Sequence, residues 1–207
     1  MPAKPTIVVV DTNCFIRLLF SPLRPVLGAT FGGYLLMTLA DLVGECGPGT
    51  EVAERHPWLL EPDVQAELQK NCLKLREPKK TDMANLAKQF RSNGNSRLRK
   101  HCEAKKLKKI RELSRADVNA LAAAQVLGGP LATDEWPLTM VANEQSDVPL
   151  VLTSVAIVHL IEKDGKISRE QRIEVVANWV KHGEKLPDDW RDQYKALFGE
   201  EPPDGQT

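Results

Sequence analysis

The first hydrophobic run of the chain predicts a buried strand. Residues 7–10 are four consecutive apolar β-branched residues, the pattern of a strand that is covered on both faces in a parallel sheet. The run ends at Asp11, Thr12 and Asn13, and apolar residues with helical spacing follow from Phe15. The chain therefore opens with a strand, a polar turn and a helix.

Hydrophobic runs and helical periodicity then alternate to the end of the chain. Strands that alternate with helices predict an α/β protein with a parallel sheet and helices on both faces. Further strands are expected at 57–60, 131–135 and 148–153. Helices are expected at 34–42, 62–75, 116–127, 154–161, 168–180 and 190–198, and another from residue 136.

One stretch departs from this alternation. Residues 76–112 are helical in pattern, strongly basic and poor in apolar residues, which predicts an arm of two helices that turns at 93–95 and projects from the body. The 207 residues are expected to form one α/β body at 1–165, which includes this arm. Residues 166–207 are expected to form a C-terminal helical extension packed on the same domain.

The net charge of zero conceals a division within the chain. Residues 70–111 hold fifteen Lys and Arg against three acids, a net charge of +12, so the remainder carries −12. This asymmetry favours a polyanionic partner such as RNA, and a solvated charged face is the simpler alternative. Phe90 is the only aromatic residue in the stretch, which argues against a base-stacking platform. The candidate RNA-binding residues are Arg97, Arg99, Lys100, Lys105, Lys106, Lys108 and Lys109.

Acidic residues recur where strands end and helices begin. Asp11 and the pair Asp134 and Glu135 follow strands, while Glu67 and Asp117 belong to helices. Strand ends and helix starts share one edge of a parallel sheet, so these carboxylates are expected to meet. Like charges held close together are stable only if they share protons or bind cations, and an all-oxygen set suits Mg²⁺ or Mn²⁺.

Three of these acids also have a simpler structural explanation. Asp11 is a good N-cap for the helix that follows it, and Glu67 matches an ordinary solvated helix charge. Asp117 completes an S-x-x-D capping box with Ser114. A capping role does not exclude a role in a site, because the first turn of such a helix also lies at the carboxyl edge of the sheet.

Hydropathy and the spacing of the cysteines argue against a membrane protein and against a zinc protein. The sequence has no run of about 18 apolar residues and no signal-peptide pattern, so no membrane segment is expected. Its cysteines are widely spaced and form no Cys/His ligand pattern, which argues against zinc and indicates reduced thiols in a cytoplasmic protein. These cysteines are Cys14, Cys46, Cys72 and Cys102.

Four short motifs follow one another over residues 6–160. They are VVVDTN at 8–13, AEL at 66–68, AD-x-x-ALA at 116–122 and LATDE-x-x-L at 131–138. Each is weak alone, but the ordered set resembles the PIN-domain (PilT N-terminus) nuclease family, most closely the bacterial toxin ribonucleases of the virulence-associated protein C type. The resemblance implies a three-layer α/β/α sandwich with a central, mostly parallel sheet.

The resemblance also implies an endoribonuclease that hydrolyses RNA phosphodiester bonds with Mg²⁺ or Mn²⁺. Asn13 and Thr133 would orient the site by hydrogen bonds. Family members commonly carry Asp or Asn where Glu135 aligns, so either Asp134 or Glu135 can be the last ligand. The metal-holding and catalytic residues implied by position are Asp11, Glu67, Asp117 and the pair Asp134 and Glu135.

The same resemblance implies partners. It suggests the toxin of a toxin–antitoxin pair, with a cognate antitoxin protein, and a homodimer. The basic arm and the C-terminal extension make the chain longer than a typical toxin of this type, which leaves a nuclease with another cellular role open. The alternative is a non-catalytic PIN-like module that binds nucleic acid or a partner. A phosphotransfer fold with an Asp nucleophile ranks below both, because the chain has no Asp-x-Asp pair.

Overall fold

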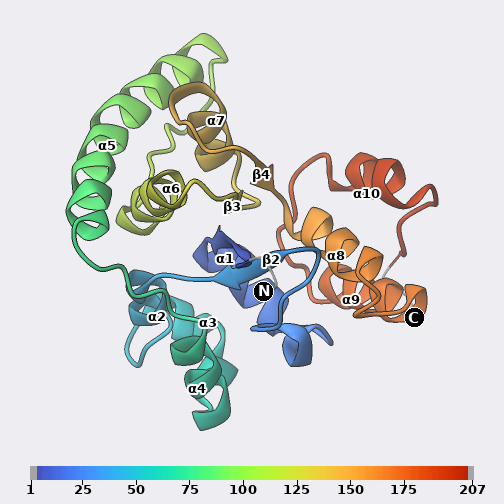
Figure 1. Ribbon diagram of the computed structural model, residues 1–207. Helices are drawn as coiled ribbons and strands as arrows, with labels where there is room; N and C mark the ends of the chain where they lie inside the picture. The colour runs from blue at the N-terminus through green and yellow to red at the C-terminus, as the bar shows by residue number, and fades with distance from the viewer. Residues whose placement is uncertain (1–3, 205–207) are drawn as a thin grey trace.

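The computed structural model describes residues 4–204 and is built around one parallel sheet (Figure 1). Its strands are β1 (Thr6–Val10), β2 (Tyr34–Met37), β3 (Leu131–Ala132) and β4 (Val151–Leu152), in the order β2-β1-β3-β4. Every neighbouring pair runs parallel. The prediction of an α/β protein with a parallel sheet is therefore confirmed.

The central strand β1 contributes to two hydrophobic cores. Successive side chains of a strand point to opposite faces, so Val8 and Val10 enter one core and Val9 enters the other, all almost fully buried. The Val9 face is covered by α5 (Lys79–Ala104), α6 (Arg115–Leu127) and α7 (Trp136–Gln145). The core of Val8 and Val10 includes residues from α1 (Thr12–Leu19), α2 (Ala40–Glu45), η2 (Pro57–Leu60), α4 (Pro62–Lys70), α8 (Ser154–Lys163), α9 (Arg169–Lys181) and α10 (Trp190–Phe198).

Two short connecting elements complete the chain between β1 and α4. They pack partly buried residues, Val26 and Val52, against the Val8 and Val10 core. The covering of β1 on both faces explains why its residues 7–10 are uninterruptedly apolar. These elements are η1 (Arg24–Val26) and α3 (Glu51–Arg55).

The prediction of a helix at 34–42 is wrong. Residues Tyr34–Met37 form β2, which pairs with β1 from Thr6↔Tyr34 to Val9↔Met37, and only then does α2 begin. The apolar residues of this stretch fit helical spacing as well as a strand, and pairing with the buried strand β1 decides between them. This change matters for function, because it places α2 directly after the carboxyl end of a strand.

The other predicted strands are also revised. Residues 57–60 form the 3₁₀ helix η2, whose first residue is Pro57. Proline lacks the N–H that a sheet ladder needs but suits the first turn of a helix. The strand expected at 148–153 is confined to Val151–Leu152.

Several helix starts match their sequence signals. Ser114 and Asp117 form the predicted capping box of α6, and Ser168 and Gln171 form that of α9. Both boxes satisfy backbone N–H groups that the first turn of a helix leaves without partners. Helices expected at 154–161 and 190–198 are present as α8 and α10.

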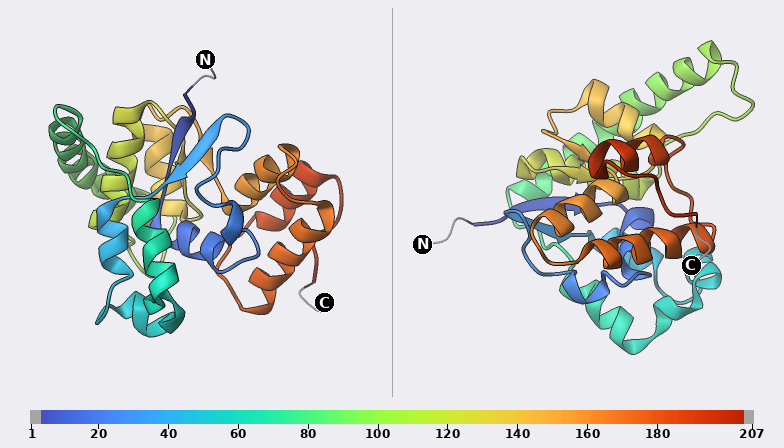
Figure 2. Two further views of the ribbon diagram at one scale, coloured as in Figure 1. Left: turned by 60° about the horizontal axis from the view of Figure 1, so that its bottom comes forward. Right: turned by 90° about the vertical axis from the view of Figure 1, so that its right-hand side faces the viewer.

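The basic stretch contains one continuous helix, α5, without the expected turn at 93–95, and residues 105–112 form a loop after it. Gly94 is buried, and a Cβ at this position would lie 3.0 Å from Val141 Cγ1 of α7. The glycine therefore allows close helix packing here and does not break the helix. Phe90 and Leu98 are buried in the core that α5 shares with α6 and α7, so most of the helix packs on the body. The right view of Figure 2 shows the end of α5 and the loop after it extending beyond the neighbouring helices.

The described part of the C-terminal extension, residues 166–204, packs on the sheet domain. Trp179 of α9 and Tyr194 of α10 are fully buried in the Val8 and Val10 core. Arg172 is also buried, and its side chain bonds Tyr194 Oη at 2.6 Å and stacks 4.2 Å above the ring of Phe198. The carboxylates of Glu162 and Glu200 balance its charge.

All four cysteines carry free thiols, and Cys14, Cys46 and Cys102 are buried. Within residues 4–204, none of the helices combines the length and the apolar character needed to cross a membrane.

The close approach of Gly129 to the central strand gives a first prediction. A Cβ at Gly129 would lie 2.1 Å from the carbonyl oxygen of Ile7 in β1, so Gly129→Ala must displace the central strand. We expect the free energy of unfolding, measured by urea denaturation, to fall by about 1–3 kcal/mol. Gly44→Ala is the matched control, because nothing lies within 4 Å of its Cβ and it belongs to α2. Equal stability of both variants would contradict the packing.

Candidate active site at the carboxyl edge of the sheet

The strand order reverses at β1. The chain passes from β1 to β2 on one side and later to β3 on the other side. In open α/β sheets such a reversal leaves a crevice outside the carboxyl ends of the two strands. Asp11 follows β1 at this point, and its backbone N–H donates to Ala132 at the end of β3 at 3.0 Å.

Asp11 is buried and fully hydrogen-bonded. Its Oδ1 accepts from the Cys14 backbone N–H at 2.8 Å, which caps α1, and its Oδ2 accepts from the Thr133 hydroxyl. Burial raises the pKa of Asp11 to about 8, the two hydrogen bonds oppose this, and the charges of Asp134 and Glu135 add to it. Asp11 is thus both a helix cap and a member of a group of carboxylates.

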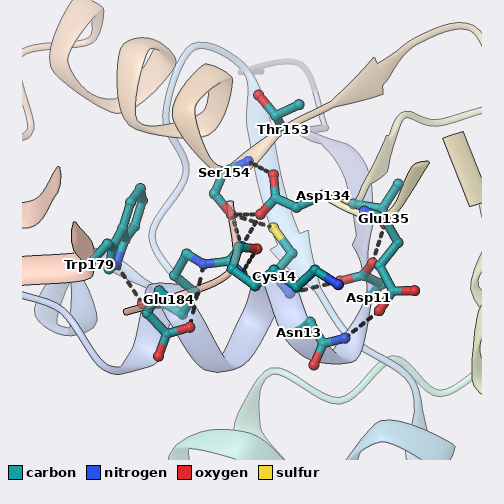
Figure 3. Close-up of polar contacts among 12 residues, drawn as sticks. Asp11, Asn13, Cys14, Asp134, Glu135, Thr153, Ser154, Trp179 and Glu184 are labelled. Atoms are coloured by element: carbon teal, nitrogen blue, oxygen red, sulfur yellow. Dashed lines mark hydrogen bonds and ion pairs between the residues drawn. The ribbon is translucent and has the colours of Figure 1, made fainter. Parts of the chain in front are cut away.

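Glu135 is directed toward Asn13 and Asp11 (Figure 3). The Asn13 side-chain amide donates to its carboxylate, and its own backbone N–H donates to Thr133 Oγ1 at 3.1 Å. Burial is the main cause of its raised pKa, and the charge of Asp117 adds to it. Both residues expected to orient the site, Asn13 and Thr133, therefore contact an acid at this edge.

Asp134 points away from Glu135 and into the protein, as Figure 3 shows. Its carboxylate pairs with the Arg17 guanidinium and accepts from the hydroxyl and, at 2.9 Å, from the backbone N–H of Ser154. The side chains of Arg17 and Asp134 are only 3% and 2% exposed. Of the two adjacent acids, Asp134 is therefore held in a buried ion pair, and Glu135 faces the other carboxylates.

Asp117 reaches the same edge from the start of α6. Its Oδ2 accepts from the Ser114 backbone N–H at 2.7 Å, so the capping role is real. Its charge nevertheless raises the pKa of both Glu135 and Glu45. The cap and the proximity to other acids coexist, because α6 begins at the carboxyl edge of the sheet.

Two acids of α2, Asp41 and Glu45, lie at this edge and were not predicted from the sequence. Glu45 accepts from the Thr12 hydroxyl, and its pKa is raised by burial first and then by the charges of neighbouring acids. Asp41 accepts from the side-chain amide of Asn119. We call the group of Asp11, Asp41, Glu45, Asp117 and Glu135 the acidic edge.

Glu67 is not brought into the acidic edge. Its carboxylate accepts from the Asn71 side chain at 3.1 Å and lies 3.7 Å from Lys70 Nζ, both at the end of its own helix. Its charge is not among those that raise the pKa of Asp11, Glu45 or Glu135. The signal for Asp41 and Glu45 is the strand at residues 34–37, because it places the start of α2 at the carboxyl edge of the sheet.

The predicted RNA-binding residues divide into two groups. Arg97 pairs with Glu144 at 2.6 Å and Arg99 pairs with Glu112 at 3.1 Å, so both guanidinium groups are engaged. The five lysines are exposed and form no ion pair with any described residue. These lysines are Lys100, Lys105, Lys106, Lys108 and Lys109.

The acidic edge has the donor chemistry for a hard cation. Carboxylate oxygens are the ligands that Mg²⁺ and Mn²⁺ prefer. In residues 4–204, however, no three His, Cys, Asp or Glu side chains are arranged to hold a metal ion. The carboxylates of Asp11, Asp117 and Glu135 each accept a hydrogen bond from a protein donor.

Comparisons of the chain with protein-family models, with curated proteins and with solved structures gave no match. Two surface pockets of 510 and 550 Å³ are lined by other residues, one around Arg172 and Phe198 and one around Phe20 and Trp58.

The buried ion pair beside the acidic edge should dominate local stability. Arg17→Met leaves the Asp134 carboxylate buried without its cation, so we expect a loss of about 3–5 kcal/mol in the free energy of unfolding. Asp134→Leu combined with Arg17→Met should lose less than Arg17→Met alone, because no unpaired charge remains on either partner. A double variant as unstable as the sum of both single variants would contradict this account.

The raised pKa of Asp11 predicts a pH dependence of stability. The carboxyl group titrates near 3.8 when unfolded and at about 8 in the fold, so the folded state holds a proton that the unfolded state has released. The free energy of unfolding should therefore fall as the pH rises from about 4 to about 8 without divalent cations. Asp11→Asn should weaken this slope between pH 5 and 8, whereas Asp63→Asn, an exposed control, should leave it unchanged.

Proposed function

We propose that the protein is a metal-dependent endoribonuclease that hydrolyses RNA phosphodiester bonds, with a PIN-like active site at the acidic edge. The observation that carries the proposal is the gathering of Asp11, Glu45, Asp117 and Glu135 at the point where the strand order reverses. These carboxylates repel one another unless some of them are protonated or a cation lies between them. A divalent cation would reduce this repulsion and could also assist hydrolysis of a phosphodiester bond.

A bound Mg²⁺ or Mn²⁺ would lower the pKa of an attacking water and stabilise charge on the phosphodiester. Asp11 and Glu135 are the proposed holders of this ion, with Asp117 and Glu45 completing the set. Thr133 and Asn13 keep the carboxylates of Asp11 and Glu135 in position through the hydrogen bonds already described. Asp117 is the proposed residue that positions or deprotonates the water.

Exposed lysines after α5 are the proposed contacts to the RNA backbone. Lys105, Lys106, Lys108 and Lys109 carry four positive charges in a short loop that ends at α6. Contacts of cations with phosphates add affinity that is independent of sequence and sensitive to salt. The loop leads directly to Asp117, so bound RNA would pass close to the acidic edge.

The order of the sequence motifs supports a toxin of the virulence-associated protein C type, acting in the cytoplasm. A cognate antitoxin protein and a homodimer belong to this proposal. A small protein encoded immediately upstream would support it, and its absence would favour a nuclease with another role.

Substitutions at the acidic edge test the proposal. With Mn²⁺ present, Asp11→Asn, Asp117→Asn and Glu135→Gln should each lower kcat/KM for RNA cleavage by about 100-fold or more. Glu45→Gln should also lower it, whereas the matched change Glu67→Gln should leave it near wild type. Cleavage by Asp11→Asn and Asp117→Asn at the wild-type rate would overturn the proposal.

The alternative is a non-catalytic PIN-like module that binds nucleic acid or a partner. One observation favours it: no preassembled metal-binding group exists among residues 4–204. Calorimetric titration with Mn²⁺ separates the two functions. Binding that disappears in Asp11→Asn supports the nuclease, and no binding by the wild-type protein supports the module.

A further inference from the structure

Two exposed cations flank the acidic edge from different layers of the fold. Arg111 lies in the loop before α6, on the Val9 side of the sheet, and Lys185 lies in the loop after α9, on the Val8 side. Figures 1 and 2 show these two loops on either side of the strands. Arg111 lies three residues before Ser114, whose backbone N–H donates to Asp117, and the backbone carbonyl of Lys185 accepts from Arg17, the partner of Asp134.

The loop that carries Arg111 is fastened on its C-terminal side. Glu112 pairs with Arg99 at 3.1 Å, and the backbone N–H of Leu113 donates to Asn95 Oδ1 at 2.8 Å. The next residue, Ser114, begins the capping box with Asp117. Arg111 is exposed and forms no ion pair with any described residue, so an anchored backbone presents a free guanidinium beside the acidic edge.

The loop that carries Lys185 is fastened by a buried arginine. The Lys185 carbonyl accepts from Arg17 Nη2 at 2.8 Å, and the Glu184 carboxylate lies 3.6 Å from Arg17 Nε. The same guanidinium pairs with Asp134, the residue before Glu135. One buried side chain therefore fixes the position of the loop relative to the acidic edge, while Lys185 itself is exposed and unpaired within residues 4–204.

We propose that Arg111 and Lys185 bind phosphates of the RNA backbone on the two sides of the acidic edge, so that the strand crosses from the loop after α5 to the C-terminal extension. The inference rests on the proposed function and extends it to a path for the substrate. A polyanion approaches a group of five carboxylates against electrostatic repulsion, and fixed cations at the rim reduce that repulsion. It also gives the C-terminal extension a direct role in substrate binding.

The salt dependence of RNA binding tests this path. Binding of a fluorescently labelled single-stranded RNA is measured by anisotropy without divalent cations, between about 50 and 200 mM NaCl. Arg111→Gln and Lys185→Gln should each reduce the slope of log K against log salt by about 0.7, and the double variant by about 1.4. Arg111→Lys should keep the wild-type slope, because the charge remains.

Lys4→Gln is the matched control. Lys4 is exposed and precedes β1, so it lies at the amino edge of the sheet, and its loss should leave the slope unchanged. If Arg111→Gln and Lys185→Gln fold normally by circular dichroism and keep the wild-type slope, the path is wrong. The nuclease proposal would survive that result if cleavage still depends on Asp11. A wild-type protein that binds no RNA would overturn both.

Discussion

A buried ion pair between Arg17 and Asp134 organises the carboxyl edge of the sheet. Both side chains are removed from water, so each charge is tolerable only while the other and the surrounding hydrogen bonds satisfy it. The guanidinium joins α1, the end of β3, the start of α8 through Ser154, and the loop after α9 through Lys185. The positions of these four segments, and hence the shape of the acidic edge, depend on this one pair.

Repulsion between carboxylates is the opposing constraint at the same edge. Asp11 and Asp117 reduce it partly by serving as helix caps, where backbone N–H groups donate hydrogen bonds to the carboxylates and stabilise their negative charge. Thr133 and Asn13 supply further donors, but the pKa values of Asp11 and Glu135 remain raised. The capping roles that first argued against a site are thus the means by which several acids can be held together without a cation.

The sequence was most informative where local signals were strong. The apolar run of β1 correctly indicated a central strand ending at Asp11, and the capping boxes located α6 and α9. It failed at residues 34–37, where an apolar stretch fits a helix or a strand and only pairing with β1 decides. That error placed Asp41 late in an expected helix and Glu45 beyond its end, so neither was expected at the carboxyl edge of the sheet, where α2 in fact begins. The turn expected at Gly94 failed because helix packing against Val141 explains the glycine.

The different roles of Asp134 and Glu135 can be related to a third residue in the sequence, Arg17. Two adjacent acids after a strand are equivalent in sequence, and their side chains must diverge because neighbouring residues point in different directions. The residue that decides between them is Arg17, far away in the chain but set within the apolar run of α1. A charged residue in a helix predicted to be buried requires a buried partner. Arg17 therefore indicates that one acid at the sheet edge is structural, and the other is left to face the remaining carboxylates.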